Sequence, residues 1–205
     1  IYKDKKNIKT RPFIIPFSLF SYRFYTQKYY LCKYMNTIEY GFSASPFGEI
    51  IVARTWKGIC DLQFLSHNRM ETIHELAQRW GEYTPTTQSD KMANLVERVI
   101  FEGYDHELTL DLQGTEFQKQ IWHELQRIPF GQTATYQEIA TRVGNPRGVR
   151  AVASAIAKNP IAMLIPCHRV VHSDGTTGEY HWGKDLKKSL IDWEAKALEN
   201  EKMKG

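Results

Sequence analysis

The chain has 205 residues and a formal net charge of +4, and 42% of its residues are hydrophobic. A chain of this length buries a sizeable core in one or two small domains, and it holds no apolar run long enough to cross a membrane. Three cysteines lack the spacing of metal ligands and are too few for a disulfide framework, namely Cys32, Cys60 and Cys167. These features exclude disulfide-rich secreted scaffolds and membrane-spanning proteins, and we expect an intracellular protein without cofactor or metal.

Positive charge is concentrated in residues 1–34, which hold eight Lys or Arg and one Asp. This segment contributes +7, so the rest of the chain carries −3, and the basic balance by itself does not indicate DNA binding. The segment has no Gly or Ala and shows no amphipathic order. We expect a disordered or non-native extension ahead of a natural start at Met35, with part of a targeting sequence as the less favoured alternative.

Residues 35–112 carry strand patterns followed by helical ones. Three strands separated by turn residues are predicted at residues 37–44, 49–54 and 58–64. Helices are predicted at residues 69–80 and 89–101, and a short strand at residues 108–112. This order is typical of an α+β domain.

The second half of the chain begins with a predicted helix over residues 115–127. Thr135 and Glu138 then have the spacing of a capping box, which starts a second helix that Gly144 ends. An Asn-Pro turn leads into a third helix over residues 147–158. The last two helices form a helix-turn-helix pattern, and the small residues of the third would let its backbone approach another surface closely.

The helix pair and the residues after it carry an excess of positive charge. Between residues 130 and 173 the only acidic residue is Glu138, whereas the basic residues are Arg142, Arg147, Arg150, Lys158 and Arg169. Such an excess suits contacts with nucleic-acid phosphates. The alternative is a helical hairpin that packs on itself and exposes a solvated charged face.

A thiol stands directly beside an imidazole in the run Ile-Pro-Cys-His-Arg-Val-Val, residues 165–171. A free thiol is mostly protonated at neutral pH, so a nucleophilic cysteine needs a base or a positive field beside it. His168 and Arg169 offer both to Cys167. Because neighbouring side chains point in different directions, His168 would reach the thiol through a water molecule. For the dipeptide taken alone, a buried structural cysteine is the alternative.

Several short motifs in this order resemble the methylated-DNA–protein-cysteine methyltransferases, also called O6-alkylguanine-DNA alkyltransferases. The resemblance runs from Gly114 to Glu194, with weaker similarity back to Ile38. The matching parts are Pro166-Cys167-His168-Arg169-Val170, the segment 131–140 ending in Thr-Tyr-Gln-Glu-Ile-Ala, Arg150-Ala151-Val152 and Asn159-Pro160. The resemblance implies an α+β fold. A small ribonuclease H-like sheet-and-helix domain over residues 35–112 would precede a helical, winged helix-turn-helix-like DNA-binding domain over residues 113–205.

For the chemistry, the resemblance implies that Cys167 takes the alkyl group irreversibly from the O6 atom of guanine, so that each molecule acts once. His168 would serve as the base through a water molecule, and Glu194 would orient it. Tyr136 would lie near the departing guanine. The resemblance leaves open whether O4-alkylthymine is also repaired. Without it, Glu194 is predicted to be a surface carboxylate on an amphipathic helix over residues 184–198.

The implied partner is double-stranded DNA containing O6-alkylguanine, contacted through the minor groove by a monomer in the cytoplasm, nucleus or nucleoid. The target base must leave the duplex to reach the thiol, and Arg150 would fill its place in the stack. The implied DNA contacts are Arg147, Arg150, Ala151, Tyr136 and Asn159. The implied substrate pocket consists of Asn159, Ile165, Pro166, Tyr180 and Trp182. A plain helix C-cap is the alternative role of Asn159.

Two features depart from the family pattern. Ala162 or Met163 stands where many relatives have proline, which would make the wall of the alkyl pocket less rigid. The pair His181-Trp182 replaces a smaller pair of some relatives, and we expect Trp182 to crowd bulky adducts such as benzyl. Some relatives bind a structural zinc, but no matching set of cysteines and histidines surrounds Cys60 and His67.

Other functions predict different features. Alkyltransferase-like proteins bind lesions without transfer, but they carry another residue, usually tryptophan, at the position of Cys167. A transcription regulator would need further domains, which residues 1–34 are too short to hold. Hydrolytic cysteine catalysis predicts turnover instead of a single use. The sequence therefore favours the methyltransferase, with lesion binding without transfer as the alternative.

Overall fold

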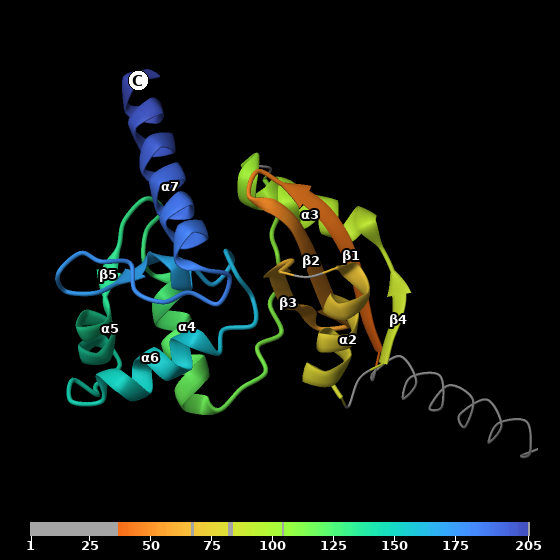
Figure 1. Cartoon of the computed structure of the whole chain (residues 1–205), viewed down its shortest axis with the longest axis horizontal. Coiled ribbons are helices and arrows are strands. Elements are labelled where there is room, and N and C mark those ends of the chain that lie inside the picture. The colour runs from red at the N-terminus through yellow and green to blue at the C-terminus, as the bar shows by residue number, and fades with distance from the viewer. Residues whose placement is uncertain (1–36, 67, 82–83, 104, 205) are drawn as a thin grey trace, which may run out of the picture. The chain divides into compact units, whose positions relative to one another are not determined.

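The computed structural model describes residues 37–66, 68–81, 84–103 and 105–204 (Figure 1). These residues all belong to one unit of the chain. The predictions for residues 1–34, including Cys32, and for His67 fall outside the described residues. Helices and strands are both present, as the predicted α+β class requires.

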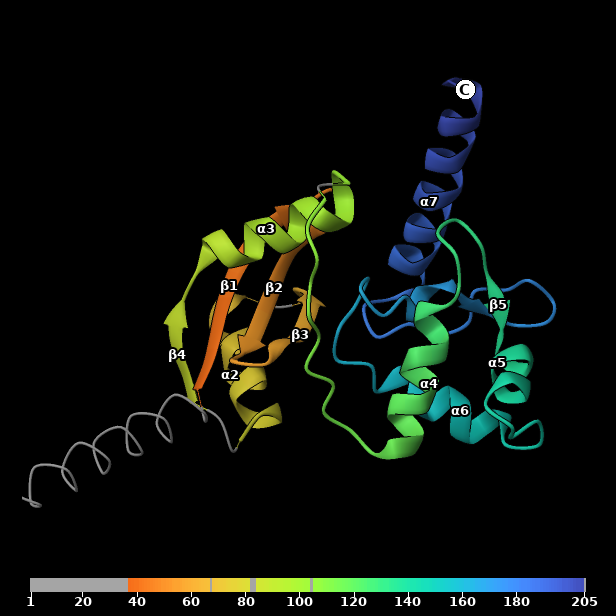
Figure 2. The same cartoon turned by 180° about the vertical axis from the view of Figure 1, so that it is seen from behind.

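A four-stranded sheet forms the first part of the described chain. Its strands are β1 (Thr37–Ser45), β2 (Gly48–Thr55), β3 (Gly58–Phe64) and β4 (Thr84–Gln88), in the order β3-β2-β1-β4. The first three pair antiparallel, whereas β4 runs parallel to β1. Two helices cover opposite faces of the sheet, α2 (Arg69–Arg79) and α3 (Asp90–Phe101) (Figures 1 and 2).

The side chains of the strands pack into two separate cores, because successive residues of a strand point to opposite faces of the sheet. Ile51, Ala53 and Cys60 pack with Leu76 and Trp80 at the α2 side. The neighbouring side chains belong to a larger cluster that includes α3 and the later helices; its strand members are Ile50, Val52, Ile59, Leu62 and Phe64. The second core therefore joins the sheet to the part of the chain that holds the site.

The sheet differs from the prediction at two places. Residues 84–88 add a strand to the three predicted between residues 37 and 64, although their polar, proline-containing sequence does not indicate one. The strand predicted at residues 108–112 is wrong as an independent strand. Its residues instead form an isolated bridge between Leu110 and Ile59, with hydrogen bonds from Ile59 N–H to Thr109 O (2.8 Å) and from Asp111 N–H to Ile59 O (2.8 Å).

Four helices and a short two-stranded parallel sheet make up the second part. The helices are α4 (Glu116–Gln126), α5 (Tyr136–Arg142), α6 (Val149–Ala157) and α7 (Lys184–Lys204), and the strands are β5 (Ala134–Thr135) and β6 (Val170–Val171). Between α6 and β6 a single 3-10 turn, η1, spans Cys167–Arg169. The helix-turn-helix prediction is confirmed by α5 and α6.

Local sequence signals fix the ends of α5. The Thr135 hydroxyl accepts the N–H of Glu138 at 3.1 Å, and the Glu138 carboxylate accepts the N–H of Thr135 at 2.7 Å, which completes the predicted capping box. After the helix, Gly144 adopts a φ of +73°, a left-handed conformation that glycine accommodates without strain. Both boundary predictions are confirmed.

The sheet and the segment that leads to η1 are hydrogen-bonded to each other. Leu62 of β3 donates its N–H to Pro160 O (2.9 Å) and accepts the N–H of Ala162 (2.8 Å). This pairing extends the edge of the sheet by one short segment and satisfies backbone groups that an edge strand would leave open. The residues before Cys167 are thereby fixed to β3. Among the described residues, no helix has both the length and the apolar character needed to cross a bilayer.

Candidate active site

Cys167 begins η1 and is 7% exposed. The side chain of Asn159, just after α6, holds the thiol and the chain before it. Its amide N–H donates to Cys167 Sγ at 3.2 Å and to Ile165 O at 2.8 Å, while its oxygen accepts the N–H of Ile161 at 3.0 Å. The cap position of α6 is Lys158, so Asn159 is not the C-cap residue itself. Its side chain instead fixes the loop that presents the cysteine.

Opposing effects act on the thiol. Burial raises the pKa of Cys167, because a thiolate loses its hydration inside the protein. The hydrogen bond from Asn159, the positive charge of Lys187 and the nearby hydroxyl of Tyr180 each lower that pKa. The Tyr180 oxygen is buried and has no hydrogen-bond partner of good geometry among the described residues, so its effect on the thiol comes from proximity.

His168 follows in the same turn and is fully buried. Its Nε2 lies 2.8 Å from Glu194 Oε1 of α7, and its Nδ1 has no hydrogen-bond partner within the described chain. Burial lowers the pKa of His168, although Glu194 opposes this. The imidazole is therefore neutral at neutral pH and can accept a proton.

The Glu194 carboxylate accepts hydrogen bonds from three residues. Besides His168, it accepts Arg169 Nε (2.9 Å) and Nη2 (3.0 Å) and the N–H of Gly131 (3.0 Å). Burial would raise the pKa of this carboxyl, but the hydrogen bonds from His168 and Arg169 lower it to about 2. An ionised carboxylate only accepts hydrogen bonds, so Nε2 of His168 carries the proton and Nδ1 keeps its lone pair.

Arg169 has a different role from the one its charge suggests. Its guanidinium binds Glu194 and donates to Ile128 O at 2.6 Å, and its side chain is only 13% exposed. The Arg169 guanidinium is therefore not available to bind DNA phosphates. Arg147 and Arg150, in contrast, are exposed at the start of α6, and neither side chain has a hydrogen bond or ion pair with the residues that the structure describes. Ala151 beside them is also exposed.

A cavity of about 240 Å³ opens onto the thiol. Five of the predicted site residues line it, namely Cys167, Asn159, Tyr136, Tyr180 and Trp182. Ile165 and Pro166 do not line it: both are buried, and Ile165 belongs to the large core. Trp182 packs against Phe64 of β3, with ring centroids 5.7 Å apart, and against Tyr180 at 5.2 Å.

The departure at Ala162 and Met163 lies away from this cavity. Both residues are buried in the large core, and Ala162 is hydrogen-bonded to Leu62. Met163 adopts a φ of +64°, where proline cannot fit because its ring fixes φ near −65°.

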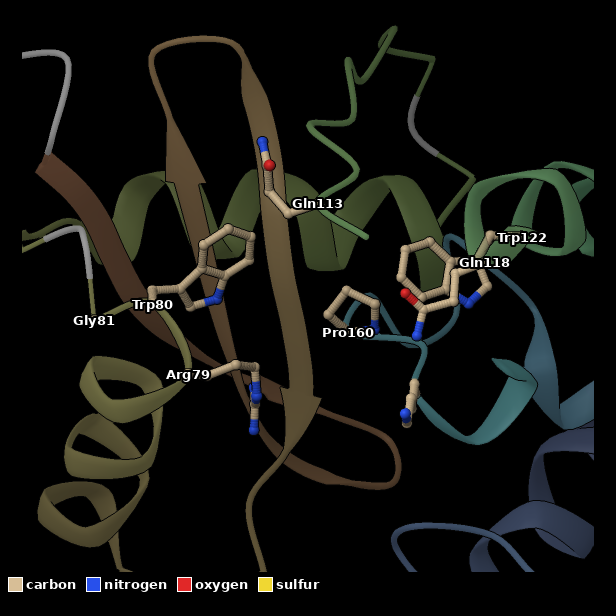
Figure 3. Close-up of a pocket in the computed structure, with 8 residues that line it drawn as sticks. Arg79, Trp80, Gly81, Gln113, Gln118, Trp122 and Pro160 are labelled. Carbon is tan, nitrogen blue, oxygen red and sulfur yellow. The ribbon is translucent and has the colours of Figure 1, made fainter. Parts of the chain in front are cut away.

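A larger cavity of about 430 Å³ lies elsewhere. Figure 3 shows Arg79 and Trp80 on one side of Pro160 and Gln118 and Trp122 on the other. The residues described as lining it include no thiol, imidazole or carboxylate. Both indole N–H groups are already used, by Asp61 and by Ala155 O. The chemistry therefore places the candidate active site at Cys167, in the smaller cavity.

Known proteins match the fold and the part of the chain that holds this site. A family model described as the DNA-binding domain of 6-O-methylguanine DNA methyltransferase matches residues 116–196. A methylated-DNA–protein-cysteine methyltransferase of Methanosarcina barkeri is 39% identical over 162 residues, which cover 78% of this chain and 98% of that protein. The crystal structure of the Mycobacterium tuberculosis O6-methylguanine methyltransferase superposes with a TM-score of 0.64 and 31% identity, covering 78% of this chain and 93% of that one.

The bifunctional transcriptional activator and DNA repair enzyme Ada of Escherichia coli is 38% identical over 163 residues. The match includes 77% of this chain but only 46% of that relative, so the chain spans about half of the relative's length. The chain belongs to the family of methylated-DNA–protein-cysteine methyltransferases.

Sequence reasoning did not single out Lys187, which lines the same cavity as Cys167. A signal for it exists: Lys187, Leu190 and Glu194 are spaced so that they share one face of a helix. All three are at most 1% exposed. A lysine on the buried face of an amphipathic helix departs from the usual pattern, in which lysine is exposed.

Replacing Glu194 with Gln tests the buried ion pair. We expect the free energy of unfolding at pH 7 to fall by about 3–5 kcal/mol, because the Arg169 guanidinium loses its buried counter-charge. The pKa of Glu194 lies below its ordinary value of 4.5, so its stabilisation is present above about pH 4.5 and is lost as the pH falls towards 2. The variant should lack this part of the pH dependence.

Urea denaturation of both proteins between pH 3 and 7 measures these effects, and Glu116→Gln serves as the matched control. Glu116 forms an ion pair with Lys119 but is 92% exposed, so its loss should change stability by less than about 1 kcal/mol. Equal stability of Glu194→Gln and wild type at pH 7 would contradict the role of this carboxylate.

Proposed function

We propose that this protein repairs DNA by transferring the methyl group of O6-methylguanine irreversibly to Cys167. The observation that carries this is the hydrogen bond to Glu194 that is donated by Nε2 of His168, the residue next to Cys167, whose thiol lines the cavity. An activated cysteine nucleophile needs a base that a third group orients, and these residues supply that arrangement. The names of the relatives, including the methyltransferase of Methanosarcina barkeri, support the same activity.

The reaction balances without a cofactor. The Cys167 thiol gives its proton to Nδ1 of His168 through a bridging water, and the thiolate attacks the methyl carbon. The sulfur–carbon bond forms while the carbon–O6 bond breaks, and its electron pair stays on the guanine. The proton held by His168 returns to the guanine, which leaves neutral. The thioether product cannot be reversed by any described group, so each molecule would act once.

The target base must leave the duplex to reach a thiol that is 7% exposed. We propose that α5 and α6 approach the minor groove and that Arg150, free of partners in the described chain, fills the gap in the stack. A solved structure of the M. tuberculosis relative, 30% identical with a TM-score of 0.62, is a complex with DNA. Tyr136 and Ala151 lie on this helix pair and Arg147 lies in the turn between the helices, and all three would contact the flanking backbone.

The domain assignment belongs to the same proposal. Residues 35–112, with the sheet, would be the ribonuclease H-like domain, and residues 113–205 the winged helix-turn-helix-like DNA-binding domain. The alternative function, binding of the lesion without transfer, is disfavoured by the cysteine at position 167 with an oriented base beside it.

The transfer itself is tested by intact mass spectrometry after mixing the protein with an equal amount of duplex that contains O6-methylguanine. We expect each molecule to gain one methyl group, on Cys167, and Cys167→Ser to gain none. Excess duplex should not increase the gain. A wild-type protein that binds the duplex but keeps its mass would instead establish a lesion-binding function.

Arg150→Ala tests base extrusion. We expect repair of duplex DNA to slow by roughly tenfold or more, because a few kcal/mol of unstacking would lose their compensation. The reaction of Cys167 with iodoacetamide should stay unchanged, since Arg150 is not among the residues lining the cavity. Arg127→Ala is the matched control, because Arg127 is 75% exposed on α4 and pairs with Glu124. Unchanged duplex repair in Arg150→Ala would remove the stacking role.

Trp182 is expected to limit the size of the transferred group, because its ring lines the same cavity as Cys167 and packs on Phe64 and Tyr180. Wild type should remove methyl much faster than benzyl from O6-alkylguanine. Trp182→Ala should raise the rate with benzyl, whereas Trp56→Ala, at a tryptophan 61% exposed, should not. Comparable wild-type rates with the two groups, measured in single-turnover experiments, would contradict this assignment.

A further inference from the structure

Lys187 is a buried cation without a protein counter-ion. Its side chain lies in the second turn of α7, is 1% exposed, and reaches the cavity that holds Cys167. Its Nζ lies 5.7 Å from the centroid of the Tyr136 ring. Among the described residues, no carboxylate pairs with it and no hydrogen bond to its ammonium is formed. Asp185, two residues earlier, is exposed. Glu179 lines the same cavity and Glu194 lies on the same face of α7, and both bind other groups.

Each of those two carboxylates, Glu179 and Glu194, already binds another charged group. Glu179 lines the cavity but is 86% exposed and pairs with Lys184 at 2.6 Å. Glu194 lies two turns further along α7 and binds His168 and Arg169. Burying an ammonium without a partner is costly, since its hydration is lost. This burial lowers the pKa of Lys187 to about 8, and the proximity of Cys167 works in the opposite direction.

The other groups that face the thiol do not supply a net positive charge. Asn159 is neutral, and burial raises the pKa values of Tyr136 and Tyr180, so both hydroxyls stay protonated. His168 is held neutral by burial. The charge of Arg169 is balanced by Glu194. His181 lines the outer part of the cavity and is exposed.

We propose that Lys187 is the counter-charge of the Cys167 thiolate, and that the buried ammonium lets the thiol ionise inside a cavity that otherwise opposes ionisation. This rests on the proposed function for its biological use, but the pairing is a property of the free protein. Lys187 acts through Cys167 and forms no bond with the substrate. The thiol proton leaves by way of His168, and the ammonium keeps its own proton.

The pairing has a second consequence. When the sulfur becomes a thioether it carries no charge, and the ammonium loses its partner. Removing the opposing anion leaves burial as the dominant effect on Lys187, so alkylation of Cys167 lowers the pKa of the lysine. Lysine ionisation therefore reports whether the acceptor has been used.

The test measures iodoacetamide modification of Cys167 between pH 5 and 9 in the full chain without DNA. Peptide mass spectrometry separates this thiol from Cys60. We expect Lys187→Met to react roughly tenfold more slowly at pH 7, with the pH profile moved upward, because one pKa unit changes the thiolate fraction tenfold. Lys187→Arg keeps the charge and should recover most of the rate. A Lys187→Met profile that overlaps the wild-type profile overturns the proposal.

Lys188→Met is the matched control. Lys188 is the next residue of α7, is 68% exposed and pairs with Asp192 at 2.5 Å. Its replacement removes the same charge from the same helix turn without removing a buried ammonium, so its profile should equal that of wild type. An equal loss of rate in Lys188→Met would show that general surface charge, and not the pairing, sets the reactivity, and would overturn the proposal.

A measurement on the wild-type protein covers the case in which Lys187→Met fails to fold. The ammonium of Lys187 is titrated by NMR of ¹⁵N-labelled lysine side chains, before and after chemical methylation of Cys167 with methyl iodide. The pKa of Lys187 should fall on methylation, and an unchanged value overturns the proposal. Neither experiment uses DNA, so a protein that fails to repair O6-methylguanine refutes the proposed function without affecting these results.

Discussion

The carboxylate of Glu194 is the interaction on which the site depends. It joins α7, η1 and the loop at Gly131 through one buried negative charge, and it compensates the guanidinium of Arg169. Because that charge is already balanced, it fixes the orientation of His168 without making the imidazole strongly basic. The same attachment sets the rotation of α7 and thereby places Lys187, two turns earlier, beside the thiol.

The sheet contributes to the site through its backbone. Leu62 holds residues 160–162 by two hydrogen bonds, and Asn159 then holds the chain up to Cys167 from the other side. Phe64, from the same strand, supports Trp182 over the cavity. No residue of the sheet lines the cavity, yet β3 holds the segment before the cysteine and contacts Trp182 of the cavity wall.

Sequence patterns predicted the parts that local physics controls. The capping box of Thr135 and Glu138 and the left-handed Gly144 define the ends of α5 independently of the rest of the fold, and the Cys-His pair is visible in the sequence alone. What the sequence did not indicate depends on contacts distant in the chain. Residues 84–88 form a strand because β1 offers an open edge, and Arg169 turns inward because Glu194 lies 25 residues further on. Lys187 was missed because its burial follows from that same helix docking.

The burial of Cys60 makes the two described thiols differ in their reactivity towards electrophiles. Its thiol lies in the smaller core with no exposed surface, and burial together with Asp61 and Asp111 raises its pKa far above the ordinary range. An electrophile in solution therefore meets two described thiols of very different nucleophilicity. Of these two thiols, Cys60 is buried beside negative groups and is unreactive, whereas Cys167 lines a cavity together with Lys187. A general thiol reagent therefore modifies Cys167 in preference to Cys60.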